Sequence, residues 1–270
     1  LLQSCEPNGI LFTNGDNDTF PLWYLQEVEK VRTDVTVANL SLLNTGWYIK
    51  QLRDLRRTSS IDGQEIELER FLNISDERIT SISTGLTRWE KKKVRINVPD
   101  DPENEKGYIE WEVKPTYAQI ALRVQDLMIL RILNDSKWKY PVYFAVTVPA
   151  SNRVGLEKFL EMEGLVYRVQ SHKVNYPQDP INAERMEELL VSNVNREVWD
   201  GGFSNKFWQN SEGGIWSRGP SNSYLFRNMG NEDVFYNKQV IRLMQNYRSA
   251  YMQLVSHHYF AARKVDCKDG

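Results

Sequence analysis

The chain has 270 residues and a mass of 31.6 kDa, and its 34 basic side chains nearly balance its 36 acidic ones. That balance gives no reason to expect nucleic acid or a strongly anionic membrane as the main partner. No stretch of the sequence approaches the roughly 20 consecutive apolar residues that a membrane span requires. A chain of this length can bury one large core or two modest ones.

The sequence starts without an initiator methionine or a signal peptide. We therefore expect it to be a piece of a longer protein whose targeting information lies outside it. Cys5 and Cys267 stand near opposite ends of the chain. Two cysteines at this spacing form no metal-binding motif, and the sequence does not indicate whether they pair.

Residues 9–52 predict a βαβ unit. An apolar run over 10–12 predicts a strand, and the Asn, Gly and Asp residues of 14–19 predict a turn directly after it. A helix follows, and then a second apolar run over 35–43 predicts another strand, which begins with β-branched residues. Strand, polar loop, helix and strand in this order are typical of α/β folds.

The first helix is predicted to run from about Pro21 to Val31, because proline suits the first turn of a helix. Asp18 or Thr19 is its expected N-cap, and Asn44 is the expected N-cap of a second helix. Three apolar residues recur on one face of the first helix and are expected to pack on the sheet: Leu22, Leu25 and Val28.

Beyond Arg57 the pattern decays. Residues 58–114 predict an insertion with a small β element, a hairpin at about 94–113, because short alternating runs stand there among turn-forming residues. A helix is then expected over 115–133, followed by a strand over 142–148 whose near-continuous apolarity is typical of strands covered on both faces.

The remaining elements are shorter until the end of the chain. A helix over 155–163 and a strand over 165–169 are predicted, with Gly164 at the helix C-cap. A helix over 183–193 precedes a loop rich in Gly, Asn, Ser and aromatic residues, and a long helix at about 237–265 closes the chain. An apolar stripe on this last helix comprises Val240, Leu243, Met244, Tyr247, Tyr251 and Leu254.

Together these elements predict an α/β fold. We expect a Rossmann-like three-layer domain with a mainly parallel sheet over residues 1–180, carrying the β-containing insertion at about 58–114. Residues 181–270 are expected to form the aromatic loop and a helical C-terminal extension packed on the same domain.

The polar loop after the first strand is the first candidate site. Ligands of open α/β sheets bind beyond the carboxyl ends of the strands, where loops lead into helix N-termini. The candidate ligand-binding residues are therefore Asp16, Asn17, Asp18, Thr19 and Asn44. The other interpretation is that Asp, Asn and Gly simply form the turn and cap the helix.

No catalytic, metal-binding or cofactor-binding motif accompanies this loop. The sequence has no Gly-x-Gly-x-x-Gly, no P-loop, no EF-hand loop and no Gly-x-Ser-x-Gly elbow. The three histidines, His172, His257 and His258, are expected to be ordinary surface or interface residues. We therefore expect no catalytic residue, no metal and no cofactor in this chain.

A second candidate site lies in the aromatic loop. Trp199, Trp208 and Trp216 could stack on sugar rings, with nearby Asn and Arg side chains supplying hydrogen bonds. The other interpretation is that these rings fasten a long loop to the surface of the domain.

Several segments resemble those of a known family. They cover residues 11–26, 28–35, 39–48, 138–145, 155–168 and 246–251. The first, Leu-Phe-Thr-Asn-Gly-Asp-Asn-Asp-Thr-Phe-Pro-Leu-Trp-Tyr-Leu-Gln, is the most specific. These segments resemble the soluble region that follows the transmembrane part of a bacterial multipass membrane family. That family was formerly of unknown function and is grouped with protein O-mannosyltransferase-like glycosyltransferases; a vertebrate relative that O-mannosylates receptor ectodomains shows a looser form of the pattern.

The resemblance implies a GT-C-type enzyme that uses a lipid-linked sugar donor. Its acidic catalytic residues would lie in the membrane part, so none carries over to this chain, and the insertion at 58–114 matches only weakly. The resemblance implies an extracytoplasmic, periplasmic location, tethered in the full-length protein. The implied partners are the membrane-embedded part of the same polypeptide and an acceptor protein or glycan.

Three hypotheses follow. The first is a non-catalytic accessory domain of a membrane glycosyltransferase that positions the acceptor protein or glycan. The second is a carbohydrate-binding module acting through Trp199, Trp208 and Trp216. The third is a small enzyme acting through Asp16 and Asp18.

Overall fold

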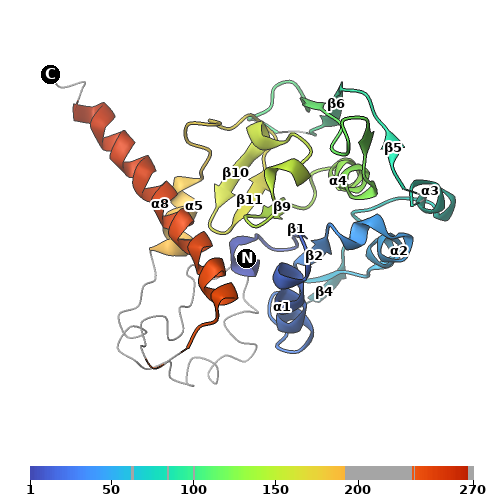
Figure 1. Cartoon of the computed structure of the whole chain (residues 1–270), viewed down its shortest axis with the longest axis horizontal. Coiled ribbons are helices and arrows are strands. Elements are labelled where there is room, and N and C mark those ends of the chain that lie inside the picture. The colour runs from blue at the N-terminus through green and yellow to red at the C-terminus, as the bar shows by residue number, and fades with distance from the viewer. Residues whose placement is uncertain (62–63, 84, 100, 192–232, 234, 267–270) are drawn as a thin grey trace.

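The computed structural model describes residues 1–61, 64–83, 85–99, 101–191, 233 and 235–266 (Figure 1). Its centre is a five-stranded sheet with the strand order β10-β11-β9-β1-β2. The strands are β1 (Ile10–Thr13), β2 (Thr36–Asn39), β9 (Val142–Ala145), β10 (Leu160–Glu163) and β11 (Val166–Val169). β1 pairs in parallel with both β2 and β9, whereas β11 pairs antiparallel with β9 and β10.

This arrangement confirms the α/β class, with a sheet that is mixed and parallel at its centre. Every residue of β1, β2 and β9 is buried, as the near-continuous apolarity of 142–148 predicts for a strand covered on both faces. Phe12 and Phe144 face each other across β1 and β9 with their ring centroids 5.0 Å apart. The specifically Rossmann-like three-layer arrangement remains a prediction.

Helix α1 (Asp16–Glu27) begins five residues before the predicted start at Pro21. Gly15, with φ of 81°, turns the chain out of β1. Acidic side chains then occupy the first turn of the helix, where their negative charge interacts favourably with the positive end of the helix dipole. Neither Asp18 nor Thr19 is the N-cap, because both lie inside the helix. Leu22 is buried and Leu25 packs against the core as predicted, but the helix ends at Glu27, so Val28 lies beyond it and is exposed.

Helix α2 (Gly46–Asp54) has Thr45 at its N-cap, so the prediction that Asn44 caps it is wrong. β2 ends at Asn39, and a short 3₁₀ turn (Leu42–Asn44) separates it from α2. The Tyr48 hydroxyl of α2 accepts the backbone N–H of Asn39 at 3.0 Å, at the open edge of the sheet. Burial raises the pKa of Tyr48 to about 12, so this hydroxyl stays neutral.

The insertion holds two hairpins and a short helix. Its elements are β3 (Thr58–Ile61), β4 (Gln64–Glu67), α3 (Asp76–Ile82), β5 (Thr87–Arg88), β6 (Lys92–Asn97) and β7 (Tyr108–Val113). The hairpin predicted at about 94–113 is confirmed, because β6 and β7 pair antiparallel from Lys92–Val113 to Asn97–Tyr108. The inner face of this hairpin, including Ile96 and Trp111, joins the main core.

Helix α4 (Val124–Asp135) covers only the second half of the helix predicted over 115–133. Residues before it form a tight turn closed by β8 (Ala121–Leu122), which pairs with β5. The helix predicted over 155–163 is also wrong: a 3₁₀ turn (Glu157–Phe159) leads into β10. Gly164 therefore lies in the β10–β11 turn with φ of 66°, because strand pairing overrides the local helical pattern.

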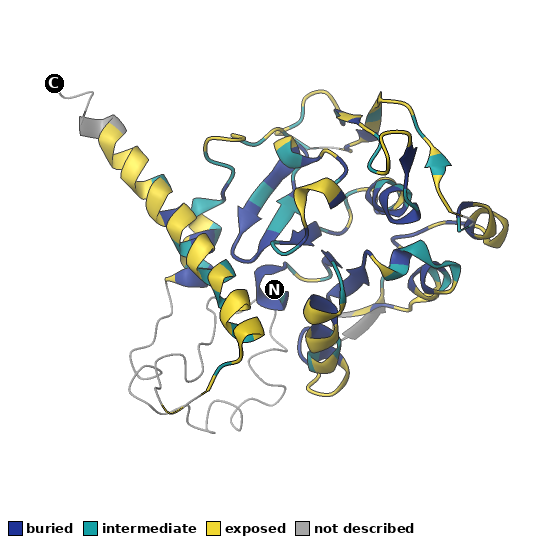
Figure 2. Cartoon of the chain, viewed as in Figure 1, coloured by how far each residue is buried: buried dark blue, intermediate teal, exposed yellow. Residues whose placement is uncertain are grey.

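The C-terminal elements are α5 (Ala183–Leu190) and α8 (Lys238–Asp266). Both pack on the β10–β11 hairpin through a second core, formed by Met162, Leu165, Ile181, Met186, Leu189, Leu190, Ala250 and Leu254. Tyr247 and Tyr251 of the predicted stripe also pack against this core, whereas Leu243 is exposed. Much of α8 faces solvent (Figure 2). None of the described helices is long and apolar enough to cross a membrane.

A buried carboxylate lies where this second core meets the sheet. Glu163, at the end of β10, is 1% exposed and lies 3.5 Å from the Arg168 guanidinium. The Asn182 side-chain amide, which caps α5, donates to it at 3.3 Å, and its other oxygen has no hydrogen-bond partner among the described residues. Burial outweighs the attraction of Arg168 and raises the pKa of Glu163 to about 7.

Glu163→Gln is therefore expected to change how stability depends on pH. The folded-state pKa is raised from 4.5 to about 7, so the wild-type chain is most stable below pH 4.5 with respect to this group and loses stability as pH rises through 7. The glutamine variant lacks this loss and should be more stable than wild type by about 3 kcal/mol at alkaline pH. Urea unfolding at about pH 5 and about pH 8 measures the difference.

The control is Glu184→Gln, which changes an exposed carboxylate on α5. It should leave the pH dependence of unfolding close to that of wild type. Parallel pH profiles for wild type and the Glu163 variant would contradict the assignment.

Candidate functional site

The strand order places a topological switch point between β1 and β9. From β1 the chain connects to β2 on one side, and the next parallel strand, β9, lies on the other side. In open α/β sheets, ligands bind beyond the carboxyl ends of the strands at such a point. The predicted loop at 14–19 follows β1, and Thr147 follows β9, so both lie at this end of the sheet.

A buried network of hydroxyls and one amide joins the strand ends to α1. The Thr19 hydroxyl donates to the Gly15 carbonyl at 2.7 Å, so it accepts from the Thr13 hydroxyl, also at 2.7 Å. The Asn39 amide donates to Thr19 at 2.7 Å and to Gly15 at 2.8 Å, and its oxygen accepts the Leu42 N–H at 2.9 Å. Thr13, Thr19 and Asn39 are all buried. The network therefore fastens the start of α1 to the ends of β1 and β2.

Asp18 is buried beside this network. Its carboxylate accepts the Thr147 hydroxyl at 2.5 Å, which joins α1 to the segment after β9. Burial raises the pKa of Asp18, although the hydrogen bond from Thr147 opposes the rise. Asp16 and Asn17 are exposed, and Asp16 accepts the Asn17 backbone N–H at 2.9 Å.

The structure places the predicted ligand residues in three different environments. Asp18 and Thr19 face other parts of the protein, and only Asp16 and Asn17 face solvent. Asn44 lies apart from them and exchanges hydrogen bonds with Gln125 at the start of α4. Ligand binding at this loop remains a prediction, and the pocket described below lies elsewhere. The partners Thr13, Asn39 and Thr147 were missed; their position at or just after strand ends is the signal that could have found them.

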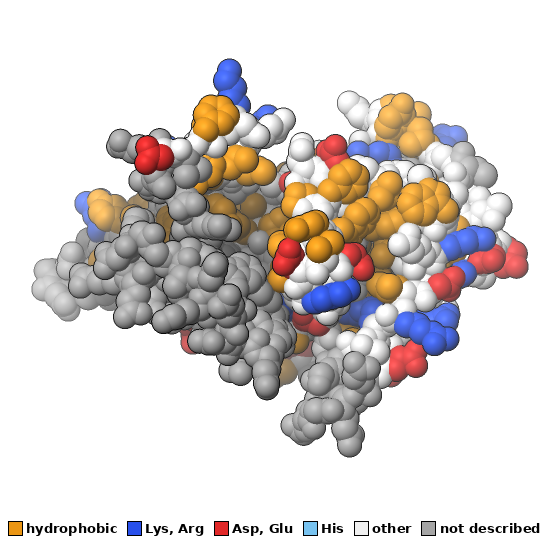
Figure 3. Space-filling view, turned by 90° about the horizontal axis from the view of Figure 1, so that it is seen from below, with side chains coloured by type: hydrophobic (Ala, Val, Ile, Leu, Met, Phe, Trp, Pro, Cys, Tyr) orange, Lys and Arg blue, Asp and Glu red, His pale blue; other side chains and the backbone are white. Residues whose placement is uncertain are grey.

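An exposed aromatic surface lies on α1 and α2, next to this loop (Figure 3). Its exposed members are Phe20, Tyr24 and Trp47, at 57%, 55% and 58% exposure. Phe20 stacks on the half-buried Trp23 with centroids 5.8 Å apart, and Trp47 meets the buried Tyr48 edge-on at 5.6 Å. Trp23 and Tyr48 are 6.4 Å apart and link the two helices. We call these five residues the aromatic surface.

The histidines and cysteines are the remaining residues that could bind a metal or act in catalysis. His172, His257 and His258 each lie within 3.1 Å of a carboxylate, from Glu103, Asp179 and Glu187 respectively. Within the described ranges, no group of three or more His, Cys, Asp or Glu side chains is placed to hold a metal ion. Cys5 is buried, and burial raises the pKa of its thiol to about 12. Cys267 and the tryptophans Trp199, Trp208 and Trp216 lie outside the described residues.

Comparison with known proteins identifies the family. The sequence model of the TMEM260-associated domain 2 matches residues 1–80 and 87–188, which is more than half of the chain. The chain belongs to this family. The match includes the central sheet, α1, α2 and α5, and it ends before α8. Neither the curated proteins nor the solved structures contain a significant match.

The hydroxyl of Thr19 is expected to matter for stability. Thr19→Val keeps the shape but removes a buried hydroxyl that donates one hydrogen bond and accepts two, so the Thr13 hydroxyl and the Asn39 amide lose this acceptor. The loss should be about 2–3 kcal/mol in the free energy of unfolding, measured by urea denaturation.

Thr36→Val is the matched control, because Thr36 is a buried threonine of the adjacent strand outside this network. It should change the free energy of unfolding by less than about 1 kcal/mol. Equal losses for the two variants would show that the network is not what holds α1.

Proposed function

We propose that this chain is an extracytoplasmic accessory domain of a membrane-bound glycosyltransferase that uses a lipid-linked sugar and resembles protein O-mannosyltransferases. In this role it holds the acceptor protein while the sugar is transferred in the membrane-embedded part of the same polypeptide. In a bacterial cell the domain would lie in the periplasm. Family membership and the resemblance of residues 11–26 support the connection to such an enzyme.

The aromatic surface is the observation that carries the role of holding a protein. Monomeric proteins rarely leave large contiguous apolar patches in solvent, and such patches mark interaction sites. Trp and Tyr are the residues most enriched among those that dominate binding energy at protein interfaces. On this chain Phe20, Tyr24 and Trp47 are each more than half exposed, and buried Tyr48 and half-buried Trp23 support them from below. The rings are therefore held in place before any partner arrives, which reduces the entropy lost on binding.

The charges around this surface favour a protein partner over a lipid headgroup. Asp16 lies at the start of α1, and Glu27 and Glu29 lie at its end. An anionic membrane would be repelled by these carboxylates, since juxtamembrane binding relies on Lys and Arg clusters. Carboxylates at the rim of an aromatic patch suit a protein with basic residues beside its own apolar contact.

The polar loop at 14–19 supports a structural role for the same segment. Thr19 makes three hydrogen bonds within the protein and Asp18 binds Thr147, so neither side chain is presented for catalysis in this structure. These contacts fix the direction in which α1 leaves the sheet. They thereby set the position of Phe20 and Tyr24 on the exposed face.

Replacing Trp47 by alanine in the full-length membrane protein tests the proposal. Transfer of sugar to an intact acceptor protein should fall at least about tenfold through a higher KM, because one interface hot spot contributes about 2 kcal/mol or more. Transfer to a short peptide acceptor should be unchanged, because such a peptide lacks the folded surface that the proposal places on α1 and α2. Phe20→Ala should likewise reduce transfer to the intact acceptor protein and leave transfer to the peptide unchanged.

Met252→Ala serves as the control, since Met252 is equally exposed but lies on α8. It should leave transfer to both acceptors unchanged. Unaltered transfer to intact acceptors by the Trp47 and Phe20 variants would overturn the proposal, as would sugar transfer from a lipid-linked donor by the 270-residue chain alone.

A further inference from the structure

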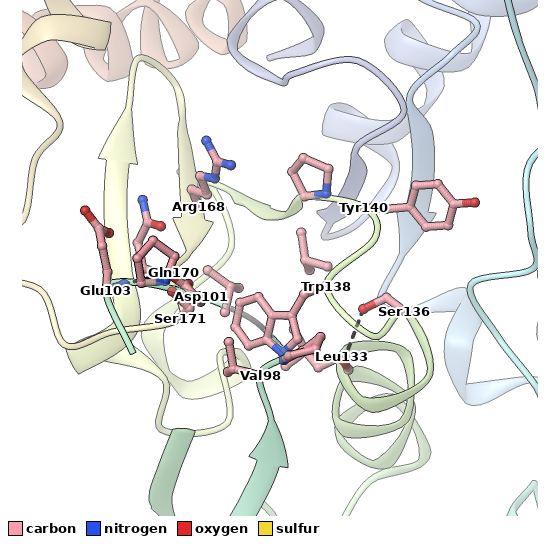
Figure 4. A pocket seen from close by; sticks show the side chains of 15 residues that line it. Val98, Asp101, Glu103, Leu133, Ser136, Trp138, Tyr140, Arg168, Gln170 and Ser171 are labelled. Carbon is pink, nitrogen blue, oxygen red and sulfur yellow. Dashed lines mark hydrogen bonds between the residues drawn. The ribbon is translucent and has the colours of Figure 1, made fainter. Parts of the chain in front are cut away.

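A pocket of about 410 Å³ lies at the opposite end of the sheet from the polar loop (Figure 4). Three segments that are far apart in the sequence form its walls: residues 98, 99 and 101–103 between β6 and β7, the α4–β9 connection with Trp138, and the end of β11 with Gln170 and Ser171. Pro141 and Val142, at the amino end of β9, also line the pocket. Its size lies within the range of about 300–1,000 Å³ that is typical of small-molecule sites.

The position of Trp138 is strongly constrained. Lys137 and Trp138 both have left-handed backbone conformations, with φ of 49° and 59°. This conformation costs a non-glycine residue about 1 kcal/mol, and it persists only where contacts with the surrounding structure enforce it. The indole N–H of Trp138 donates to the Asn97 carbonyl at 2.8 Å, which fixes the ring on the pocket wall.

The facing wall is also held before any ligand binds. The Asn104 amide donates to the Ser171 carbonyl at 2.5 Å and to the Tyr108 carbonyl at 3.1 Å, so the β6–β7 loop is attached to the end of β11. The Asp101 carboxylate accepts the Glu103 backbone N–H at 2.8 Å. A site whose walls are fixed in this way loses little entropy when it binds a ligand.

The polar groups of the pocket restrict the class of ligand. The hydrogen bond from Ser171 lowers the pKa of Asp101, so this carboxylate is ionised at neutral pH. Together with Glu103 it makes the wall unfavourable for phosphates and carboxylates. The Arg168 guanidinium does not neutralise these two carboxylates, because it is already paired with other acidic groups: it lies 2.6 Å from the Glu6 carboxylate and 3.5 Å from that of Glu163.

A purely apolar ligand is equally unsuited, because Gln170, Ser171 and the two carboxylates would lose hydration without gaining hydrogen bonds. A neutral ring with hydroxyl groups fits both features. Its apolar C–H face can pack on an indole ring, and its hydroxyls can bind planar amides and carboxylates at its edge.

The Gln170 amide already donates to Glu161 at 2.5 Å and the Ser171 hydroxyl to Asp101, so these side chains and Asp101 offer their oxygens as acceptors. We propose that this pocket binds the end of a neutral saccharide, with Trp138 as the stacking ring and the side-chain oxygens of Gln170, Ser171 and Asp101 as acceptors for its hydroxyls. The site is separate from the aromatic surface. It does not rest on the role of the chain in sugar transfer, because saccharide binding is a property of the chain alone.

Saturation-transfer NMR with the 270-residue chain tests the proposal. The probes are the methyl glycosides of glucose, mannose, galactose and N-acetylglucosamine, with free glucuronate as an anionic comparator. At least one neutral glycoside should bind with a dissociation constant on the order of millimolar, and glucuronate should bind more weakly. Absence of saturation transfer from all four neutral glycosides would overturn the proposal.

Variants locate the binding. Trp138→Ala should weaken binding at least about tenfold, and Trp138→Phe should retain part of it because the ring is kept. Gln170→Ala provides a second test that leaves the Trp138 backbone untouched, and it should also weaken binding. Tyr259→Ala, which removes an exposed aromatic side chain on α8, should have no effect. Binding that survives both the Trp138→Ala and the Gln170→Ala changes would place the saccharide elsewhere and contradict the proposal.

Discussion

The hydrogen bonds among Thr13, Thr19, Asn39 and Gly15 are the constraint on which the N-terminal half of the structure depends. They lie at the carboxyl ends of two adjacent parallel strands, where backbone groups would otherwise be buried without partners. Because Thr19 belongs to α1, the same bonds fix the axis of that helix relative to the sheet. An unmade bond here leaves a buried polar group, which costs more than the bond itself contributes.

The direction of α1 determines which of its residues meet solvent. Its buried face carries Thr19, Leu22 and Gln26, so Phe20 and Tyr24 point outward. The Gln26 amide also donates to the carbonyls of Arg32 and Val35, which secures the far end of the helix. A helix held at both ends can keep aromatic side chains in water without rearranging to bury them. The polar groups on the buried face of α1 and the aromatic side chains on its exposed face therefore both follow from the way this helix packs on the sheet.

The sequence predicts the parts of this fold that local pattern controls. The apolar runs at 10–12 and 142–148 correspond to buried central strands, and the alternating run near 94–113 corresponds to the β6–β7 hairpin. Prediction fails where tertiary pairing overrides the local pattern, as in the 155–163 segment, which has helical spacing but pairs as β10. It also misplaces the start of α1, since Pro21 is tolerated one turn inside the helix.

The candidate sites show the same limit. The place of Asp18 and Thr19 beyond a strand follows from the sequence. Which strand ends supply their partners is seen only in three dimensions: Asn39 ends β2, and Thr147 follows β9. The pocket beside Trp138 could not be predicted at all, because three segments far apart in the sequence build its walls. The polar network and the pocket occupy opposite ends of the sheet, so a protein at the aromatic surface and a saccharide in the pocket would not compete directly.

The central claim is that an acceptor protein binds the aromatic surface of α1 and α2. Hydrogen–deuterium exchange of the full-length membrane protein, with and without the proposed acceptor protein, tests it most directly. We predict slower exchange in residues 16–27 and 46–54 when the acceptor is present, with α8 unchanged. Unchanged exchange in both helices, with protection confined to other parts of the domain, would contradict it.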